Sequence, residues 1–395
     1  MQLARTAEFL GLKRNIILLL SAIVIIGAGE EMWMRFVPKY LEALGAGVLV
    51  IGLYDALKTL LGAIYAYPGG VIADRLGHRR ALVAFNLFSI AGYALVLAVP
   101  RWSAVIAGMF LFLSWSCFSL PATFSLVGAS LAANRHAMGI GVQSLVKRLP
   151  ILFGPVLGGK LIDHFGVVTG VRIALAITIA LGVVTIFFQR QIQENAELPH
   201  ASAHGFWNTL RAFEPGLRRL LLSDILVRFC ERIPFAWVVI YAMNVAGVSA
   251  TQAGLLTSVE MIFAMLCFIP VAHFADKHGR EPFVFVTFIF FTLFPVALVF
   301  AKTFALLLVA FAIRGLKEFG EPARKALIIG FCPPERRGQM VGAYYLVRDV
   351  VVTPGAFLGA ALWKISPAAN FWSAAALGVA GTVSYAFLTQ RRSTR

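Results

Sequence analysis

Charged residues are scarce in this chain: Asp, Glu, Lys and Arg make up 14% of its 395 residues. Soluble domains contain about 25% charged residues, so the scarcity excludes an ordinary soluble protein. Hydrophobic residues reach 59%, and the mean hydropathy is +0.81. The composition therefore indicates a protein whose surroundings are the lipid bilayer.

Cysteine is also rare, with four residues and no CxxC or Cys/His spacing. We therefore expect neither a disulfide framework nor a metal site. The sequence lacks a Gly-rich phosphate loop, a GxSxG motif and an HExxH motif. These absences argue against an enzyme and against ATP-driven transport, and we expect no cofactor.

Apolar runs recur along the chain, separated by short polar segments. A helix needs about 20 mostly apolar residues to cross the hydrocarbon core. We therefore expect an all-α membrane protein. Twelve transmembrane helices are predicted, near residues 14–38, 48–69, 80–99, 103–128, 137–163, 169–189, 216–244, 251–273, 282–301, 303–327, 338–362 and 368–389.

Positive charge is in excess, with a formal net charge of +16. Lys and Arg do not gather in one stripe, as nucleic-acid binding would require, but fall between the apolar runs. They concentrate at the termini and in the even-numbered loops, which is typical of cytoplasmic segments. We expect a monomer in the plasma (inner) membrane with both termini cytoplasmic. Its expected partners are the lipid bilayer and a small-molecule substrate, not nucleic acid.

The two halves of the chain resemble each other at an offset of about 201 residues, so that Glu30 aligns with Glu231 and Tyr40 with Tyr241. A repeat of this kind predicts two six-helix bundles related by pseudo-twofold symmetry, with a substrate cavity near the bilayer midplane. The expected parts are an N-terminal bundle, a cytoplasmic linker and a C-terminal bundle, at residues 1–189, 190–215 and 216–395.

The most specific motif follows the second apolar run and reads Gly70-Val71-Ile72-Ala73-Asp74-Arg75-Leu76-Gly77-His78-Arg79-Arg80. It resembles the signature loop of the major facilitator superfamily, Gly-x3-Asp-Arg-x-Gly-x-Arg-Arg, at every specified position. The chain resembles that family over its whole length, which implies its twelve-helix fold and transport by alternating access. The resemblance implies a cytoplasmic gate at Gly70, Asp74, Arg75, Gly77, Arg79 and Arg80, with a degenerate second copy at Asp276, Lys277 and Gly279.

The fifth run contains Gly154-Pro155-Val156-Leu157-Gly158-Gly159, which is similar to the antiporter signature of this family. The match is partial, because Pro150 stands where the signature has its leading Gly. Small residues that allow close helix packing are the alternative explanation. The fourth run also lacks the Arg that is usual in drug/proton antiporters of the family, although the tenth contains Arg314.

Charges within the apolar runs need a partner or a wet cavity, since each costs about 2.5–3.5 kcal/mol at the bilayer centre. In the tenth run, opposite charges recur at a spacing of four residues, which predicts ion pairs along one continuous helix with a kink at Pro322. The predicted pairs are Arg314/Glu318, Lys317/Glu321 and Glu321/Lys325.

Several acids are candidate proton carriers. A carboxylate held partly out of water takes up a proton readily and can exchange it for substrate. Cross-helix ion pairs are the alternative role for these side chains. The candidates are Glu30, Glu31, Glu231 and Glu260.

Further charges lie at similar depths in the second, fifth, eighth and eleventh runs: Asp55, Lys58, Lys147, Arg148, Glu260, Arg348 and Asp349. In the family that the chain resembles, the second helix packs on the eleventh and the fifth on the eighth. We therefore expect inter-bundle charge pairs that break and re-form during transport. Glu260 is expected near Lys147 or Arg148, and Asp55 near Arg348.

The cavity is expected to combine cations with aromatic walls, from Trp33, Tyr54, Phe235, Trp237, Arg314 and Lys317. This lining favours an amphipathic substrate with an anionic or zwitterionic group. Three functions remain open: proton-coupled export (antiport) of small amphipathic molecules, proton-coupled uptake (symport) of an organic anion or zwitterion, and a non-transporting receptor or lipid-handling role.

Overall fold

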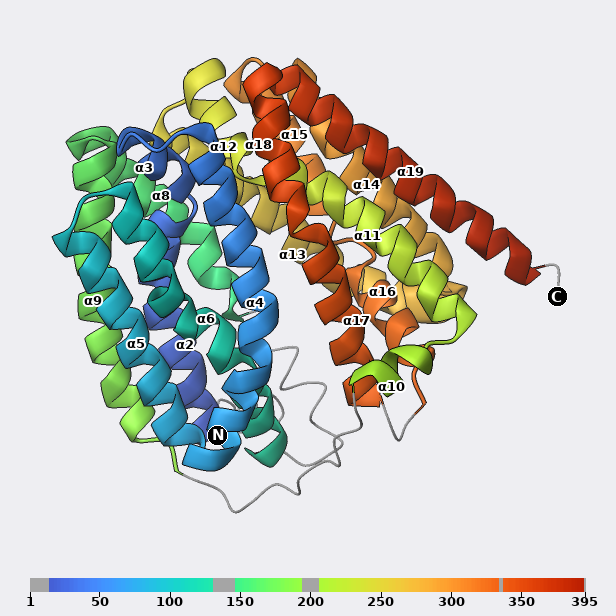
Figure 1. Cartoon of the computed structure of the whole chain (residues 1–395), viewed down its shortest axis with the longest axis horizontal. Helices are drawn as coiled ribbons and strands as arrows, with labels where there is room; N and C mark the ends of the chain where they lie inside the picture. Colours follow the sequence, from blue (N-terminus) through green and yellow to red (C-terminus); the bar gives the residue numbers. More distant parts are fainter. Residues whose placement is uncertain (1–13, 131–145, 194–205, 334–336, 394–395) are drawn as a thin grey trace, which may run out of the picture. The chain divides into compact units, whose positions relative to one another are not determined.

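The computed structural model describes residues 14–130, 146–193, 206–333 and 337–393, and the regular structure in these ranges is helical (Figure 1). A helix satisfies its own backbone hydrogen bonds, which a chain in lipid requires. Large apolar side chains also lie exposed on the outer helices, among them Phe187, Leu266 and Phe387. An all-α membrane protein is therefore confirmed.

The chain divides into two compact units, each of which we describe by itself. Unit 1 takes the described residues within 1–46, 61–200 and 249–254, and unit 2 those within 47–60, 201–248 and 255–395. The predicted bundle boundaries at 189 and 216 stay a prediction. Segment 47–60 lies in the first half of the sequence but groups with unit 2. Segment 249–254 lies in the second half but groups with unit 1.

Unit 1 is built on α2, which packs against α8 and α9, while α5 packs against α6 and α9. Its core gathers apolar side chains of α2, α5 and α6, including Leu19, Phe85 and Trp115. The helices are α2 (Arg14–Met34), α3 (Val37–Ala43), α4 (Val48–Leu76, whose first residues belong to unit 2), α5 (His78–Ala98), α6 (Trp102–Ser130), α8 (Arg148–Phe165) and α9 (Val167–Arg190).

Unit 2 is built on α19, which lies along α11 and α14 (Figure 1). Its core includes Phe288, Tyr344 and Tyr385. The helices are α10 (Phe206–Arg211), α11 (Pro215–Phe235), α12 (Trp237–Ile240), the π-helix η2 (Tyr241–Val245), α13 (Ala250–His278, whose first turn belongs to unit 1), α14 (Glu281–Phe300), α15 (Phe304–Leu316), α16 (Glu321–Gly330), α17 (Arg337–Val352), α18 (Pro354–Ile365) and α19 (Pro367–Ser393).

Three predicted spans are interrupted rather than continuous. The seventh run divides into α11, α12 and η2 just after Pro234, and the eleventh into α17 and α18 just before Pro354. The tenth divides into α15 and α16, with a turn over residues 317–320. Proline removes a backbone donor and clashes with the preceding turn, so each of the first two breaks has a local cause.

Seven helices in the described ranges are long and apolar enough to cross a membrane. The predicted count of twelve stays a prediction. Helix α11 falls short because it contains many charges, and α15 because it has 13 residues. The seven are Arg14–Met34, Val48–Tyr65, Arg79–Ala98, Val167–Arg190, Ala250–Cys267, Glu281–Phe300 and Gln339–Ile365.

The repeat predicted from sequence recurs in the packing of the two units. A Cβ added to Gly158 of α8 would lie 1.6 Å from the carbonyl oxygen of Met32, and one on Gly359 of α18 would lie 2.2 Å from that of Ile233. Each member of the second pair follows its counterpart by 201 residues. The same close approach of two helices is therefore built twice.

Two further glycines show how segments 47–60 and 249–254 pack within the units with which they group. At the start of α13, a Cβ on Gly254 would lie 2.4 Å from the carbonyl oxygen of Pro155, and in α4 one on Gly52 would lie 2.7 Å from Ala360 Cβ. The first contact is inside unit 1 and the second inside unit 2. In the fifth run, Gly158 and Gly159 approach neighbouring backbones as closely, which fits the packing explanation of that motif, while the antiporter signature stays a prediction.

Candidate functional site

Helix α11 supplies four charged side chains to the interior of unit 2. Asp224, Arg228, Glu231 and Arg232 recur at spacings of three and four residues, which brings them to one side of a helix. Arg228 lies 3.7 Å from Asp224 and 2.8 Å from Glu231. The helix therefore presents a charged face whose members also pair with one another.

The tenth run contributes charges from two helices. Two of the predicted i,i+4 pairs, Arg314/Glu318 and Lys317/Glu321, reach into the turn between these helices and are replaced by pairs with other helices, whereas Glu321 and Lys325 stay four residues apart on α16. Lys317 pairs with Glu231 at 2.6 Å, and Glu321 accepts from Arg228 at 2.7 Å. The turn at 317–320 ends the helical register that those pairs need. Gly320 packs at this turn so closely that a Cβ would lie 2.2 Å from the carbonyl oxygen of Phe283.

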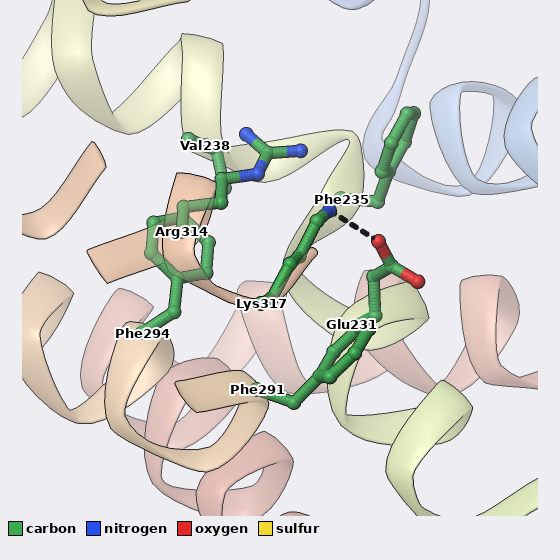
Figure 2. A pocket seen from close by; sticks show the side chains of 7 residues that line it. All are labelled: Glu231, Phe235, Val238, Phe291, Phe294, Arg314 and Lys317. Carbon is green, nitrogen blue, oxygen red and sulfur yellow. Dashed lines mark hydrogen bonds and ion pairs between the residues drawn. The ribbon is translucent and has the colours of Figure 1, made fainter. Parts of the chain in front are cut away.

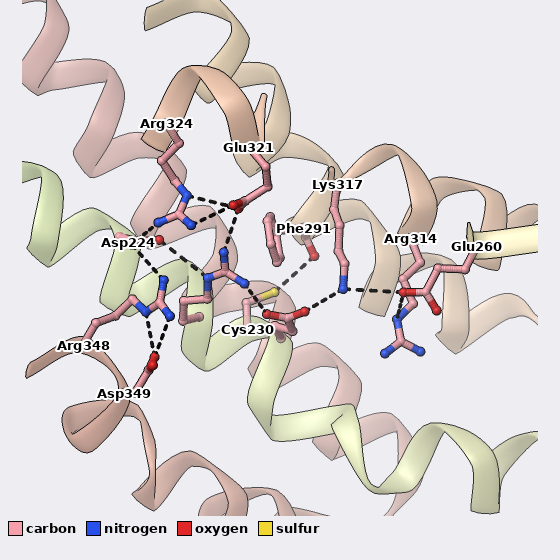
Figure 3. Close-up of polar contacts among 12 residues, drawn as sticks. Asp224, Cys230, Glu260, Phe291, Arg314, Lys317, Glu321, Arg324, Arg348 and Asp349 are labelled. Carbon is pink, nitrogen blue, oxygen red and sulfur yellow. Dashed lines mark hydrogen bonds and ion pairs between the residues drawn. The ribbon is translucent and has the colours of Figure 1, made fainter. Parts of the chain in front are cut away.

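Asp224 stands at one end of the ion-pair network. Arg324 and Tyr344 donate to its carboxylate, the latter at 3.0 Å, and Arg348 lies 3.6 Å away. Arg348 also pairs with Asp349 at 2.7 Å. Three helices, α11, α16 and α17, are therefore tied through these charges (Figure 3).

Glu260 of α13 closes the other end of the network. Its Oε1 lies 3.2 Å from Nε of Arg314 and 3.6 Å from Nζ of Lys317. All three side chains are less than 10% exposed. The expected Glu260 partners, Lys147 and Arg148, belong to unit 1, so that pairing stays a prediction; within unit 2, Glu260 pairs with Arg314 and Lys317.

A small cavity lies beside these pairs (Figure 2). It combines three phenylalanine rings with both ends of the Glu231–Lys317 pair and the guanidinium of Arg314. Its lining residues are Glu231, Phe235, Val238, Phe291, Phe294, Arg314 and Lys317. Phe235, Arg314 and Lys317, three of the predicted cavity residues, thus line one space, and their role in binding a substrate stays a prediction.

Cations crowd the ring of Phe235. Arg232 lies 4.8 Å from its centroid, Arg314 5.8 Å and Lys58 6.0 Å. These distances are within the range of cation–π attraction. The faces of the cavity's aromatic rings therefore already have cationic neighbours from the protein itself.

Asp55 pairs with Arg232 at 3.0 Å, and not with Arg348 as expected. Arg348 pairs instead with Asp349 at 2.7 Å and with Asp224 at 3.6 Å. The expectation placed charges by depth along their helices. It had no information on the direction in which each side chain leaves its helix.

Three aromatic residues expected in the cavity are absent from its lining, among the residues that the structure describes, and are buried. Trp33 is 0% exposed, Tyr54 3% and Trp237 1%. Trp237 stacks on Trp363 with ring centroids 5.1 Å apart. Large aromatic side chains bury much apolar area, and here that area goes into the core.

In unit 1, Glu30 lies in an aromatic cluster. Tyr93 donates a hydrogen bond to its carboxylate, and the rings of Tyr93 and Phe112 lie 5.9 and 5.2 Å from that of Trp33. Glu31 pairs with Arg35 at 3.2 Å, as the i,i+4 spacing predicted. At equivalent positions of the repeat, Glu30 thus accepts from the Tyr93 phenol, and Glu231 pairs with Lys317 and Arg228.

The two loops of the predicted cytoplasmic gate share a backbone feature. Gly77 and Gly279 both have positive φ, 80° and 86°, and each precedes a helix. Of the remaining gate residues, Arg75 and Arg80 are exposed and Arg79 is half-buried. The side chains of Gly70, Asp74, Asp276 and Lys277 lie outside the described residues, so the gate stays a prediction.

Sequence reasoning missed Asp163, whose carboxylate accepts from the backbone N–H groups of Ala250 and Thr251 at 2.8 and 2.9 Å. Ser249 and Gln252 complete the first turn of α13 by exchanging side chain–backbone hydrogen bonds. The Ser-x-x-Gln spacing is a capping box that the sequence displays. Nothing in the sequence indicated that Asp163 would reach it.

Comparison with known proteins agrees with this architecture. The family model of the Major Facilitator Superfamily matches residues 19–247 and 220–395. The chain belongs to the major facilitator superfamily. It is therefore a multi-pass integral membrane transporter and not an enzyme.

Named relatives of this superfamily member are bacterial. The multidrug resistance protein MdtG of Yersinia enterocolitica is 24% identical over 362 residues, covering 89% of this chain and 86% of the relative. MdtG of Serratia proteamaculans is 23% identical over 405 residues and covers 100% and 98%.

Solved structures share the fold at lower identity. A transporter of the POT family in complex with 5-aminolevulinic acid aligns with a TM-score of 0.78 at 13% identity, over 95% of both chains. The nucleoside transporter NupG aligns with a TM-score of 0.76 at 13% identity, over 95% of this chain and 99% of the other.

Proposed function

We propose that this superfamily member exports small amphipathic organic molecules in exchange for protons. The observation that carries the proposal is the cavity of unit 2, in which three phenylalanines and ionised side chains line the same space. Such a lining accepts an apolar body and a polar group together. The multidrug resistance relatives named above support export.

Glu30 is the proposed proton carrier. It is 8% exposed, and its carboxylate accepts from a phenol within an aromatic cluster. Glu231 accepts from Lys317 and Arg228, and we assign it to the ion-pair network. Glu31, beside Arg35, and Glu260, beside Arg314, take the same structural role.

A second candidate is proton-coupled uptake of an organic anion. The specific observation in its favour is the pair of cations, Arg314 and Lys317, in the cavity lining. In either case we propose a plasma (inner) membrane location with both termini cytoplasmic, and a transmembrane ion gradient as the only energy source.

The direct test uses purified protein in liposomes that contain a trapped pH dye. A panel of amphipathic anions, neutral compounds and cations is added outside, and both compound uptake and internal pH are followed. Antiport moves protons against the compound, so uptake of compound makes the lumen more alkaline. Symport moves both inward and acidifies the lumen.

Glu30→Gln is the decisive variant, with Glu214→Gln as its control, since Glu214 is exposed and lies before the first turn of α11. We expect Glu30→Gln to abolish proton movement and Glu214→Gln to leave it unchanged. Compound movement without any proton movement in the unmodified protein would overturn proton coupling.

A further inference from the structure

Asp55 is a buried acid that lies outside the ion-pair network of unit 2. It belongs to the part of α4 that groups with this unit, and it is 2% exposed. Its Oδ1 accepts from Arg232 at 3.0 Å. Its Oδ2 is also buried and, among the residues that the structure describes, has no hydrogen-bond partner. One of the two oxygens is therefore without a donor in the interior, where an ionised oxygen of this kind is costly.

A single cation compensates the charge of Asp55. Arg232 is the one Lys or Arg within ion-pair distance of it in the described ranges. The acids of the network are each paired with two or more cations: Asp224, Glu231, Glu260 and Glu321. The charged and titratable groups that face Asp55 are Arg232 and Glu231 of α11 and, on its own helix, Lys58 and Tyr54. Of these five acids, Asp55 is thus the one with the fewest paired cations.

A proton is the ligand that fits the unpartnered oxygen. Burial favours the neutral form of a carboxyl group, and a proton on Oδ2 removes the charge while Oδ1 still accepts from Arg232. A metal ion would need several oxygen ligands around it. Within the described part of the chain, no group of three or more acidic, His or Cys side chains could hold such an ion.

We propose that Asp55 is a second proton-binding site of this transporter, in addition to Glu30. Protonation cancels the negative charge with which Arg232 pairs. The Arg232 guanidinium lies 4.8 Å from the ring centroid of Phe235, which lines the cavity (Figure 2), so a proton at Asp55 adds one positive charge beside the cavity. The inference rests on the proposed function and deepens it, since a second site allows a second proton to be exchanged for each substrate molecule.

The experiment follows proton binding in the whole purified protein in detergent, without substrate and without a gradient. Infrared difference spectra between about pH 7 and about pH 5.5 detect the carbonyl stretch of protonated carboxyl groups, while exposed carboxylates stay ionised over this range. A pH indicator in weakly buffered solution counts the protons taken up over the same step. We expect a carbonyl band that grows on acidification and is lost in Asp55→Asn, together with one proton of the count. Spectra in which no band depends on Asp55 would overturn the proposal.

Arg232→Gln tests the assigned pair, because Arg itself does not titrate in this range. Loss of the cation favours the neutral carboxyl group, so the Asp55 band should persist to a pH about 1–3 units higher. Glu214→Gln is the control, since Glu214 is exposed and lies before the first turn of α11; it should leave the spectra and the proton count unchanged. An Asp55 band at an unshifted pH in Arg232→Gln would refute the role of the pair.

The double variant Asp55→Asn/Arg232→Gln guards against a folding artefact, because it removes both charges of the pair. It should melt close to the unmodified protein and lack the same band, and a band that survives in it would overturn the proposal. Failure of this inference and failure of the proposed function look different. If no band depends on Asp55 while proton movement in liposomes is lost in Glu30→Gln, the inference fails and the proposed function stands. If the Asp55 band is present in a protein that moves no protons with any compound, the proposed function fails and the second site stands.

Discussion

Arg324 is a fully buried cation, 1% exposed, and it donates to Asp224 and Glu321. Asp224 is 0% exposed and also accepts from Tyr344. The desolvation of such charges offsets most of their attraction, so the cluster adds little net stability. Its effect is to make the position of each charge depend on all the others.

Removal of one partner from this cluster should be strongly destabilising. We expect Arg324→Gln to lower the free energy of unfolding by about 3–5 kcal/mol, because two buried carboxylates lose a shared cation. Thermal melting of the purified protein in detergent measures the change. Lys325→Gln, one residue further along and exposed, should shift stability by less than about 0.5 kcal/mol. Equal effects of the two variants would mean that water screens the cluster.

At the scale of helices, close approach depends on glycine at one position of each unit. Gly158 of α8 meets the backbone of α2 at Met32, and Gly359 of α18 meets that of α11 at Ile233. Backbones that approach this closely leave no room for a Cβ, and the contact replaces the hydrophobic drive that is missing between helices in lipid.

Gly158→Ala should therefore separate α2 from α8. Because the added Cβ would meet the Met32 carbonyl at 1.6 Å, we expect a loss of stability of about 1–3 kcal/mol or more, seen as a lower melting temperature. Gly342→Ala is the matched control, since its Cβ would meet nothing within 4 Å. It should be neutral or stabilise by about 0.5–1 kcal/mol. A tolerated Gly158→Ala would show that the two helices slide freely.

The tenth run shows where sequence reasoning stops at the scale of elements. Regular spacing of charges from Arg314 to Lys325 is compatible with one continuous helix, and that was the expectation. The structure places a turn at 317–320, so Lys317 reaches Glu231 of another helix. Pro322 predicted a kink, and it stands in the first turn of α16, directly after this turn. The packing of Gly320 against Phe283 shows that the helix is interrupted there rather than bent.

For the whole molecule, the distribution of Lys and Arg predicts the topology. Both termini should be cytoplasmic, since positive residues flank the termini and the even-numbered loops. A green fluorescent protein fused to the C-terminus should fluoresce, because it folds in the cytoplasm. Alkaline phosphatase at the same position should be inactive, and the reverse result would invert the proposed orientation.

The fold class was accessible from sequence, because lipid imposes a composition and a segment length that few other environments tolerate. The signature loop and the internal offset narrowed it to one superfamily. The site was accessible in part: Phe235, Arg314 and Lys317 do share a cavity. Trp237 was misplaced, because an aromatic residue in an apolar helix serves the core as well as a cavity.

By itself, therefore, the sequence determined that this protein lies in the lipid bilayer, that it is helical, that its two halves repeat and to which family it belongs. Those properties depend on the amino-acid composition and on the spacing of the apolar runs. Neither depends on which residues meet in space. Tertiary structure alone decided which charges meet: Asp55 with Arg232, Glu260 with Arg314 and Asp163 with the start of α13. A long side chain in a low-dielectric interior takes the nearest counter-charge in space, and spacing along one helix does not specify that distance.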